Sequence, residues 1–454
     1  MIILNWLPEI FLICLLFVVL MVTTFRMWSY RSLSLCIGIA SLAELIYLLA
    51  RQDLAFFDSP LKILYSDSLS YFGKVMSILC LVVFSLGIHF HRGLNFRSKQ
   101  NANLFLIFYS IFLMGMFEAN NLVLFLGSAI GIYVCSTTLI LIESGQSQSW
   151  VRIFRQRALL FSVWMVVLAL LSIYGMSLFG SVYLSDWIQA FSKGSASQVE
   201  LFVFSFLILL ASAIPLRELM HVGNAPFGLS VFCYGLFLLL SIFWMRLGVP
   251  FFHLSGFLPK TVAQILIAMM FGIFSLHYAI QTVRTREHHR WYASALPTVV
   301  GLSLFLVLLS GEHTLPEFYS ISIAMLFTFG LVSHAFLDQE YRHKTLLVLS
   351  MLSLMGAPPL ILGEQFYRLI HDAVSAGNLM AGILMFASWL ILSVAITQMI
   401  GKVLLVRVAV AARRKFLFSE WFFLGMYLLC VISLTAFRPQ VVSLLNDHPV
   451  LNLW

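Results

Sequence analysis

The sequence predicts an all-α polytopic membrane protein with about fourteen transmembrane helices, ten of them arranged as two inverted five-helix repeats. Its composition is the first reason: 61% of the 454 residues are hydrophobic and only 10% are charged. A soluble domain holds about 25% charged residues. Because so few charges cannot cover the surface of a soluble protein, we expect lipid and not water to surround the apolar side chains. The other reasons are near-continuous apolar segments and two proline breaks in corresponding places.

A helix needs about 20 mostly apolar residues to cross the hydrocarbon layer of a bilayer. The sequence supplies fourteen such segments, at roughly 4–24, 31–50, 68–90, 101–117, 119–142, 155–181, 199–220, 226–247, 261–282, 292–310, 315–337, 344–363, 376–405 and 418–437. Met1 to Trp6 has no basic stretch, and no small-residue cleavage site follows the first apolar run. We therefore expect the first segment to remain as a membrane helix.

The connections between these segments are mostly short, and the widest lie around 51–67, 183–198 and 248–260. No soluble domain is inserted, so we expect a single membrane domain over 1–454. We divide it into three helices in 1–100, a first inverted repeat in 101–247, a second in 248–405, and a last helix with its tail in 406–454.

The basic residues predict the orientation of the chain. If the N-terminus is outside, nineteen of the 27 Lys and Arg residues fall on the inner side, and Lys74 lies within a helix. The outer set has seven members: Arg51, Lys62, Lys193, Arg246, Lys260, Arg368 and Arg438. Because basic residues concentrate in inner loops, we expect both termini on the outer side. The formal charge of +8 is then explained by topology and lipid headgroups, and we expect no nucleic-acid partner.

Two segments are interrupted by proline. The segment at 199–220 contains Ser212-Ala213-Ile214-Pro215, and the segment at 344–363 contains Met355-Gly356-Ala357-Pro358-Pro359. Proline in a helix removes a hydrogen bond and clashes with the preceding turn. Each break lies in the fourth segment of a five-segment set, and five crossings invert the second set relative to the first. Paired broken helices of this kind indicate an inverted-repeat transporter fold; the alternative is two unrelated proline kinks.

Several motifs fall in the order found in one known family. Residues 350–376 contain a Ser-Leu-x-Gly-x-Pro-Pro pattern followed by Gly363-Glu364-Gln365-Phe366, and this motif is the most specific. The others are Leu7-Pro8-Glu9, Asp67 with Lys74, Ala119 to Leu122 with Phe125 to Gly127, Ser212 to Pro215, and Gly223 to Pro226. The chain therefore resembles the antiporter-like subunit N (subunit 2) of respiratory complex I, the proton-pumping NADH:quinone oxidoreductase.

The resemblance implies a row of ionisable residues along the membrane midplane. In that family the ionisable residues are a glutamate on the fifth helix and lysines on the seventh, eighth and twelfth helices. A proton relay in low dielectric needs titratable groups of this kind. This sequence departs from the pattern at all four positions, where it has Ala129, Leu210, Tyr234 and Gln365. Val299 also stands where the family often has histidine. We therefore expect the usual relay to be missing.

Five ionisable residues are the remaining candidates for a proton path. They follow the two breaks or lie within a helix: Arg217, Glu218 and His221 after Pro215, Glu364 after Pro358 and Pro359, and Lys74 in the segment at 68–90. The alternative for each is a paired charge that only holds helices together, because intramembrane charges must pair whether or not they move ions.

No other chemistry competes in the sequence. It has no Gly-rich phosphate loop, no HExxH and no GxSxG, and its six cysteines are scattered singly. We expect no catalytic residue, metal or cofactor in this chain. Three functions remain open: a membrane-arm subunit of a complex I-like oxidoreductase, a subunit of a multisubunit cation/proton antiporter or inorganic-carbon transporter of the same fold, and a structural subunit whose ion path has decayed. Under the first, the chain lies with other membrane subunits in a bacterial plasma membrane or a mitochondrial inner membrane.

Overall fold

The computed structural model is predominantly helical in the part of the chain that it describes, with an isolated β-bridge between Asn121 and Tyr183. Nine helices are long and apolar enough to cross a membrane, and four shorter apolar helices accompany them in these residues. The all-α polytopic class with about fourteen helices is thus confirmed. The described residues are 7–25, 30–50, 67–90, 96–144, 148–193, 197–217, 225–255, 260–285, 288–309, 314–335, 344–356, 362, 366–367, 370–371, 379–405, 421, 424–425 and 427–428.

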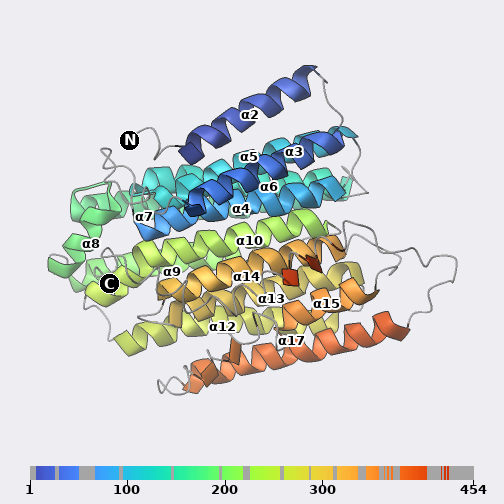
Figure 1. Cartoon of the computed structure of the whole chain (residues 1–454). Helices are drawn as coiled ribbons and strands as arrows, with labels where there is room; N and C mark the ends of the chain where they lie inside the picture. Colours follow the sequence, from blue (N-terminus) through green and yellow to red (C-terminus); the bar gives the residue numbers. More distant parts are fainter. Residues whose placement is uncertain are drawn as a thin grey trace. The chain divides into compact units, whose positions relative to one another are not determined.

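The chain divides into two compact units, with the divisions inside the helices α9 and α10. The first unit contains the N-terminal helices and a short later segment (Figure 1). Its helices are α2 (Leu7–Phe25), α3 (Tyr30–Ala50), α4 (Ser68–Phe90), α5 (Phe96–Glu118), α6 (Leu122–Ser144), α7 (Gln148–Phe179), α8 (Leu184–Lys193), most of α9 (Gln198–Arg217), the π-helical turn η3 (Trp244–Gly248) and α11 (Val249–Leu254).

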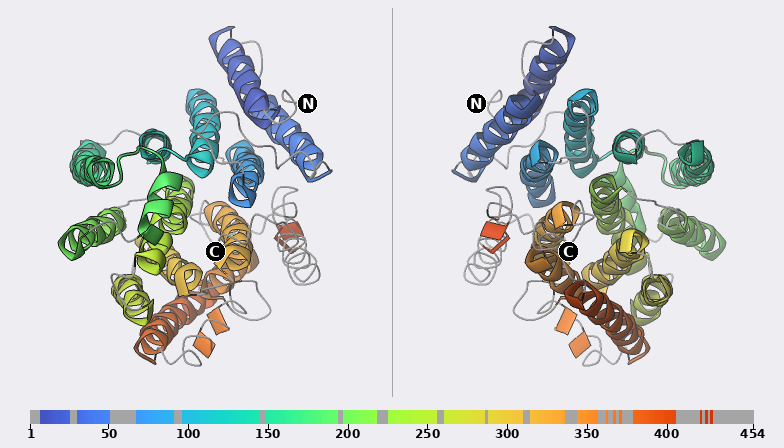
Figure 2. Two further views of the ribbon diagram at one scale, coloured as in Figure 1. Left: turned by 90° about the vertical axis from the view of Figure 1, so that its left-hand side faces the viewer. Right: turned by 90° about the vertical axis from the view of Figure 1, so that its right-hand side faces the viewer.

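The second unit contains most of α10 and the helices of the C-terminal half. They are α10 (Pro226–Phe243), α12 (Lys260–Arg284), α13 (His288–Leu309), α14 (Thr314–Ala335), α15 (Lys344–Met355) and α17 (Leu379–Leu405). Helix α12 packs against α13 and α17, and α14 packs against α13 and α15. Within each unit taken by itself, several helices are seen nearly end-on in Figure 2, as expected for membrane spans that run side by side.

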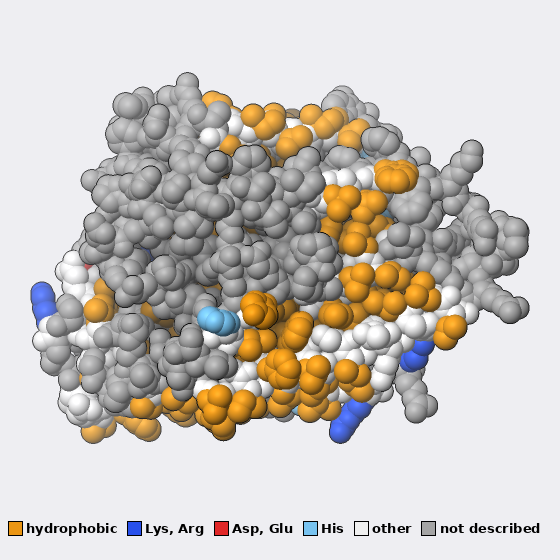
Figure 3. Space-filling view, turned by 60° about the horizontal axis from the view of Figure 1, so that its bottom comes forward, with side chains coloured by type: hydrophobic (Ala, Val, Ile, Leu, Met, Phe, Trp, Pro, Cys, Tyr) orange, Lys and Arg blue, Asp and Glu red, His pale blue; other side chains and the backbone are white. Residues whose placement is uncertain are grey.

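The surface of the second unit shows how such a helix is divided between protein and lipid. On α17, Ile383, Phe386 and Leu390 are exposed, whereas Met385 and Leu392 are buried. Exposed apolar residues at helical spacing form a stripe along one side of the helix. Figure 3, which brings the side of α12 and α17 forward, shows a described surface that is mostly hydrophobic, with the charged side chains near its edges. This composition suits contact with lipid tails.

The structure describes the surroundings of the two predicted breaks only in part. Helix α9 contains Pro215 in its last turn and ends at Arg217. Helix α15 ends at Met355, and Gly356 follows with a positive φ of 66°, which a glycine adopts without steric cost. The two inverted repeats and the subdivision at 248 remain predictions.

Two of the wide connections that we expected are partly helical. The stretch 183–198 contains α8, and the stretch 248–260 begins with the π turn and α11. Helix α8 buries Leu184, Trp187 and Phe191 on one face. Phe191 meets Phe204 and Phe251 in an aromatic cluster, with ring centroids 5.9 and 5.2 Å away. This helix has no apolar segment of about 20 residues, because it is short and amphipathic, so the pattern of membrane spans did not predict it.

Candidate functional site

The π turn η3 places a charged residue inside an apolar span. Pro250, the second residue of α11, has no N–H to donate, so the α-helical pattern cannot continue unchanged through it. Instead, the Val249 N–H bonds the carbonyl of Trp244, five residues earlier. A π turn adds a residue to the helix and shifts the direction of the side chains around it, and such turns are frequent at functional sites. The residue in the middle of this turn is Arg246, only 5% exposed.

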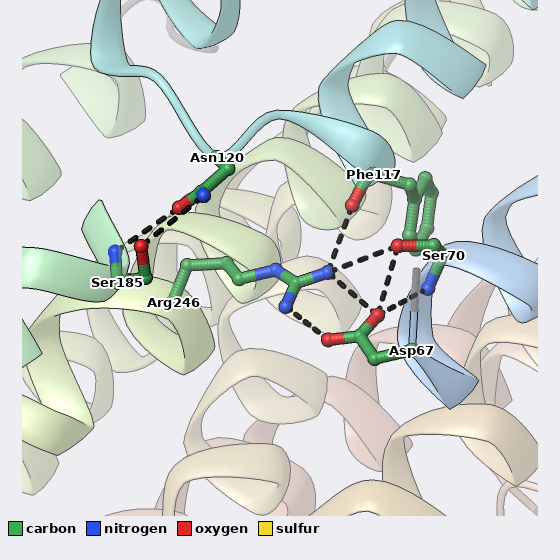
Figure 4. A network of polar contacts seen from close by, with 6 residues as sticks. All are labelled: Asp67, Ser70, Phe117, Asn120, Ser185 and Arg246. Atoms are coloured by element: carbon green, nitrogen blue, oxygen red, sulfur yellow. Dashed lines mark hydrogen bonds and ion pairs between the residues drawn. The ribbon is translucent and has the colours of Figure 1, made fainter. Parts of the chain in front are cut away.

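Arg246 forms a bidentate ion pair with Asp67, which immediately precedes α4 (Figure 4). Its Nη2 lies 2.9 Å from Asp67 Oδ1 and also donates to the carbonyl of Phe117 at 2.9 Å and to Ser70 Oγ at 3.3 Å. A guanidinium matches a carboxylate in this fork geometry. The pair therefore joins η3, the start of α4 and the end of α5.

Asp67 also caps α4. Its Oδ1 accepts hydrogen bonds from the backbone N–H and the hydroxyl of Ser70, each at 2.8 Å, which is the pattern of an N-cap carboxylate. Burial opposes the charged form of Asp67, but Arg246 and the two bonds from Ser70 outweigh it and hold the pKa of the carboxyl below its ordinary value. Asp67 is thus a carboxylate in the folded protein.

Lys74 lies at the centre of a second ion network, two turns further along α4. Its Nζ is 2.7 Å from Oε1 of Glu9 on α2 and 3.1 Å from Oε1 of Glu118, the last residue of α5. Asp67, Ser70 and Lys74 are spaced i, i+3 and i+7, so they share one face of α4. The two networks therefore lie along the same line of α4 and meet the same end of α5.

A glycine allows α4 and α5 to approach closely at this point. A Cβ on Gly73 would lie 2.2 Å from Cβ of Phe117, too close for any real contact. The Phe117 ring instead lies over the bare backbone and meets Phe72 edge to face, with centroids 6.2 Å apart. This approach brings the Phe117 carbonyl to Arg246 and Glu118 to Lys74.

The connection between α5 and α6 is fixed to α8 by an asparagine. Asn120 Oδ1 accepts the Ser185 N–H at 3.0 Å, its Nδ2 donates to Ser185 Oγ at 3.2 Å, and its carbonyl accepts the Leu184 N–H at 2.7 Å (Figure 4). These bonds satisfy N–H groups that the first turn of α8 leaves free. The short helix α8 is thereby held beside the chain segment that contains Phe117 and Glu118.

The contacts agree with the alternating crossings predicted from the sequence. Glu9 begins the first predicted span, Asp67 precedes the third, Glu118 ends the fourth and Arg246 lies at the end of the eighth. With alternating crossings these four positions fall on the same side of the membrane, and the ion pairs bring them together. Which side that is follows only from the distribution of basic residues.

Of the five predicted proton-path residues, the structure places Lys74 in an ion network. Arg217 is the last residue of α9, and Pro215, two residues before it, is buried. The other predicted positions, Glu218, His221, Glu364, Pro358 and Pro359, lie outside the described residues.

The positions where the resemblance implies relay residues are packed as ordinary membrane core. Ala129 on α6 and Val299 on α13 are fully buried, and Leu210 is partly buried on α9. Tyr234 on α10 is also fully buried; its hydroxyl donates to the carbonyl of Ser322 at 3.2 Å. Gln365 lies outside the described residues. None of the four described residues is a lysine or a carboxylate.

Sequence reasoning missed three members of the two networks. Glu9 entered only as part of an opening motif, Glu118 was not singled out, and Arg246 was counted among outer basic residues. The count gave no sign that Arg246 is buried and paired with Asp67. The available signal was an ionisable residue within an apolar span or at its end, which must find a partner. Its partner is 179 residues away in sequence, so only the fold reveals the pair.

The fold is found in known respiratory membrane complexes. A chain of respiratory complex I from Thermus thermophilus with bound NADH superposes with a TM-score of 0.74 at 16% identity, over 96% of each chain. A chain of the same complex with bound aureothin gives 0.71 at 13% identity, over 95% of this chain and 99% of that one. A chain of an archaeal membrane-bound sulfane sulfur reductase gives 0.71 at 11% identity, over 98% and 97%. No family model matches the sequence, and a search of curated proteins finds no match.

Proposed function

We propose that this chain is an antiporter-like membrane-arm subunit of an assembly like respiratory complex I. The observation that supports it most is the superposition on a complex I chain over 96% of both chains, which leaves no sizeable part of this chain for another activity. The ordered motifs, above all the one at 350–376, support the same role. The chain then lies in an energy-transducing membrane, beside other membrane subunits and with both termini outside.

Within that assembly we propose a mainly structural role. The apolar or neutral residues at the relay positions, among them Ala129 and Tyr234, provide no group that takes up and releases a proton near neutral pH. An independent carrier cannot lose its whole relay, which disfavours a cation/proton antiporter or an inorganic-carbon transporter. Any surviving path has to use Arg217, Glu218, His221, Glu364 or Lys74.

Purification in mild detergent tests the assembly. We expect other membrane subunits and redox subunits to copurify with a tagged chain. A monodisperse monomer that transports cations after reconstitution would contradict the proposal and favour the transporter alternative.

Two substitutions beside the predicted breaks test the proton path. Glu218→Gln and Glu364→Gln are made separately, and proton pumping is measured against electron transfer in the assembled complex. An unchanged ratio in both variants supports the structural role. A lower ratio with assembly intact shows a rebuilt proton path. Glu143→Gln, a change at the end of α6, is the control.

The match to a sulfane sulfur reductase supports a second version of the same proposal. The fold occurs in a complex that reduces sulfane sulfur. In this second version, the chain belongs to a complex I-like assembly whose electron acceptor is not a quinone. The copurifying redox subunits distinguish the two versions, since purified assemblies can be assayed with quinones and with sulfane sulfur as electron acceptors.

A further inference from the structure

Four helices of the first unit each contribute one ionisable side chain at the same end. They are Glu9 on α2, Glu44 on α3, Lys74 on α4 and Glu118 on α5, and we call them the acid cluster. Lys74 pairs with Glu9 and Glu118, and α3, which carries Glu44, packs against α2, α4 and α5. Glu44 is 9% exposed as a residue, and the Glu118 side chain is 8% exposed.

The charges of the acid cluster do not balance. It has three carboxyl groups and a single ammonium group, whereas the neighbouring Asp67 and Arg246 neutralise each other. Among the described residues, full ionisation would leave two uncompensated negative charges between apolar helices. Desolvating an unpaired charge costs several kcal/mol, so a buried carboxyl in this position takes up a proton instead. Carboxyl groups that share one site behave in the same way.

The geometry favours a proton over a metal or sodium ion. The Lys74 ammonium already lies between two carboxylates, in the place that a bound cation would take. Among the described residues, no group of three His, Cys, Asp or Glu side chains has the spacing of a metal site. Glu44 Oε1 is buried and has no hydrogen-bond partner in the described part of the chain. The Tyr71 hydroxyl, which also reaches α3, does not serve as a donor to Glu44, because it donates to the Leu48 carbonyl at 3.0 Å.

We propose that the acid cluster is a proton-binding site that holds one exchangeable proton, on Glu44 or Glu118. The proton removes one of the surplus charges, and its release leaves Lys74 to compensate three carboxylates. The site lies on α2 to α5 and involves none of the positions at which the resemblance implies a relay. It goes beyond the proposed function, because it depends on the charge balance of these helices and not on the assembly to which they belong.

Infrared difference spectroscopy tests the site directly. The tagged chain, together with any subunits that copurify, is placed in lipid nanodiscs and taken from mildly acid to mildly alkaline pH. A protonated carboxyl has a C=O stretch that disappears on ionisation. We expect the spectrum of the wild type minus that of Glu44→Gln or Glu118→Gln to show the loss of one such band per chain. Glu143→Gln, at the end of α6, should leave the band unchanged.

A lysine variant gives a second, independent readout. Lys74→Met removes the compensating ammonium, so we expect a larger carboxyl band that persists to higher pH. A merely structural role of Lys74 predicts no such shift. The proposal is overturned if the wild-type spectrum contains no band that either glutamine variant removes. It is also overturned if sodium at constant pH abolishes that band, because the site would then bind a cation. A wild-type spectrum with no carboxyl band that is lost over this pH range would also overturn the proposal, and that measurement does not depend on any variant folding.

Discussion

Asp67 and Arg246 form one ion pair, but removing the two partners should have unequal effects on stability. The Arg246 side chain is 6% exposed and the Asp67 side chain is 22% exposed. We therefore expect Asp67→Asn to destabilise the folded chain more than Arg246→Met does. The reason is what each change leaves behind: a buried guanidinium in the first variant and a partly hydrated carboxylate in the second.

The expected sizes follow from the contacts. Removing one partner of a buried pair costs about 3–5 kcal/mol, and Asp67→Asn should approach this range because Arg246 loses its carboxylate while its bonds to Ser70 and the Phe117 carbonyl are to neutral groups. In Arg246→Met, Asp67 keeps water and both bonds from Ser70, so we expect roughly 1–3 kcal/mol. The double variant leaves no buried charge and should be more stable than Asp67→Asn alone.

Equilibrium unfolding in mixed micelles, followed by tryptophan fluorescence, measures these free energies. Equal effects of the two single variants, or a double variant whose loss is their sum, would refute the reasoning. The dependence on pH gives a further check. Because the pKa of Asp67 is held below its ordinary 3.8, its stabilisation is complete above that pH and is lost as the pH falls through the lowered pKa. The gap between the wild type and Asp67→Asn should therefore narrow in acid.

Three further predictions use simpler changes. Gly73→Ala places a methyl group against the α5 phenylalanine and should cost about 1–3 kcal/mol in the same unfolding assay, whereas Gly127→Ala, with nothing within 4 Å, should be neutral or stabilising. Tyr234→Phe loses the bond to the Ser322 carbonyl, so we expect a cost of about 0.5–1.5 kcal/mol and unchanged proton pumping. Cysteines at 413–415 should react with membrane-impermeant reagents from the inner side only; labelling from the outer side would reverse the orientation.

Helix positions were predictable because membrane spans need long apolar segments. The segment expected at 68–90 is α4, and the segment at 376–405 is α17 to within three residues. Lipid excludes unsatisfied backbone groups, so a long apolar run has few alternatives to a helix. The last expected segment, 418–437, lies mostly outside the described residues. Composition alone could not predict α8, because this ten-residue helix has one apolar and one polar face and is too short to resemble a membrane span.

The ion networks were not predictable because their members come from distant parts of the chain. The sequence shows that Asp67 and Lys74 share a helix face, but it does not show that Glu9 and Glu118 approach Lys74. The π turn at Arg246 depends on Pro250, whose effect on a helix can be a kink, an end or an added residue. The choice among these depends on whether Arg246 finds a partner for its charge. That partner, Asp67, is brought near only by the fold.

The distribution of charge in the described helices has a physical explanation. A charge costs most at the bilayer centre and less near the ends of a span. The relay positions Ala129, Tyr234 and Val299 are uncharged and close-packed. By contrast, Lys74 and Arg246 each find carboxylate partners where spans begin or end. Where the relay has been lost, these charges near the span ends are retained because their ion pairs fix the register between neighbouring helices, which apolar packing alone does not. The surplus carboxyl groups of the acid cluster leave one place in the first unit where a proton can still be held.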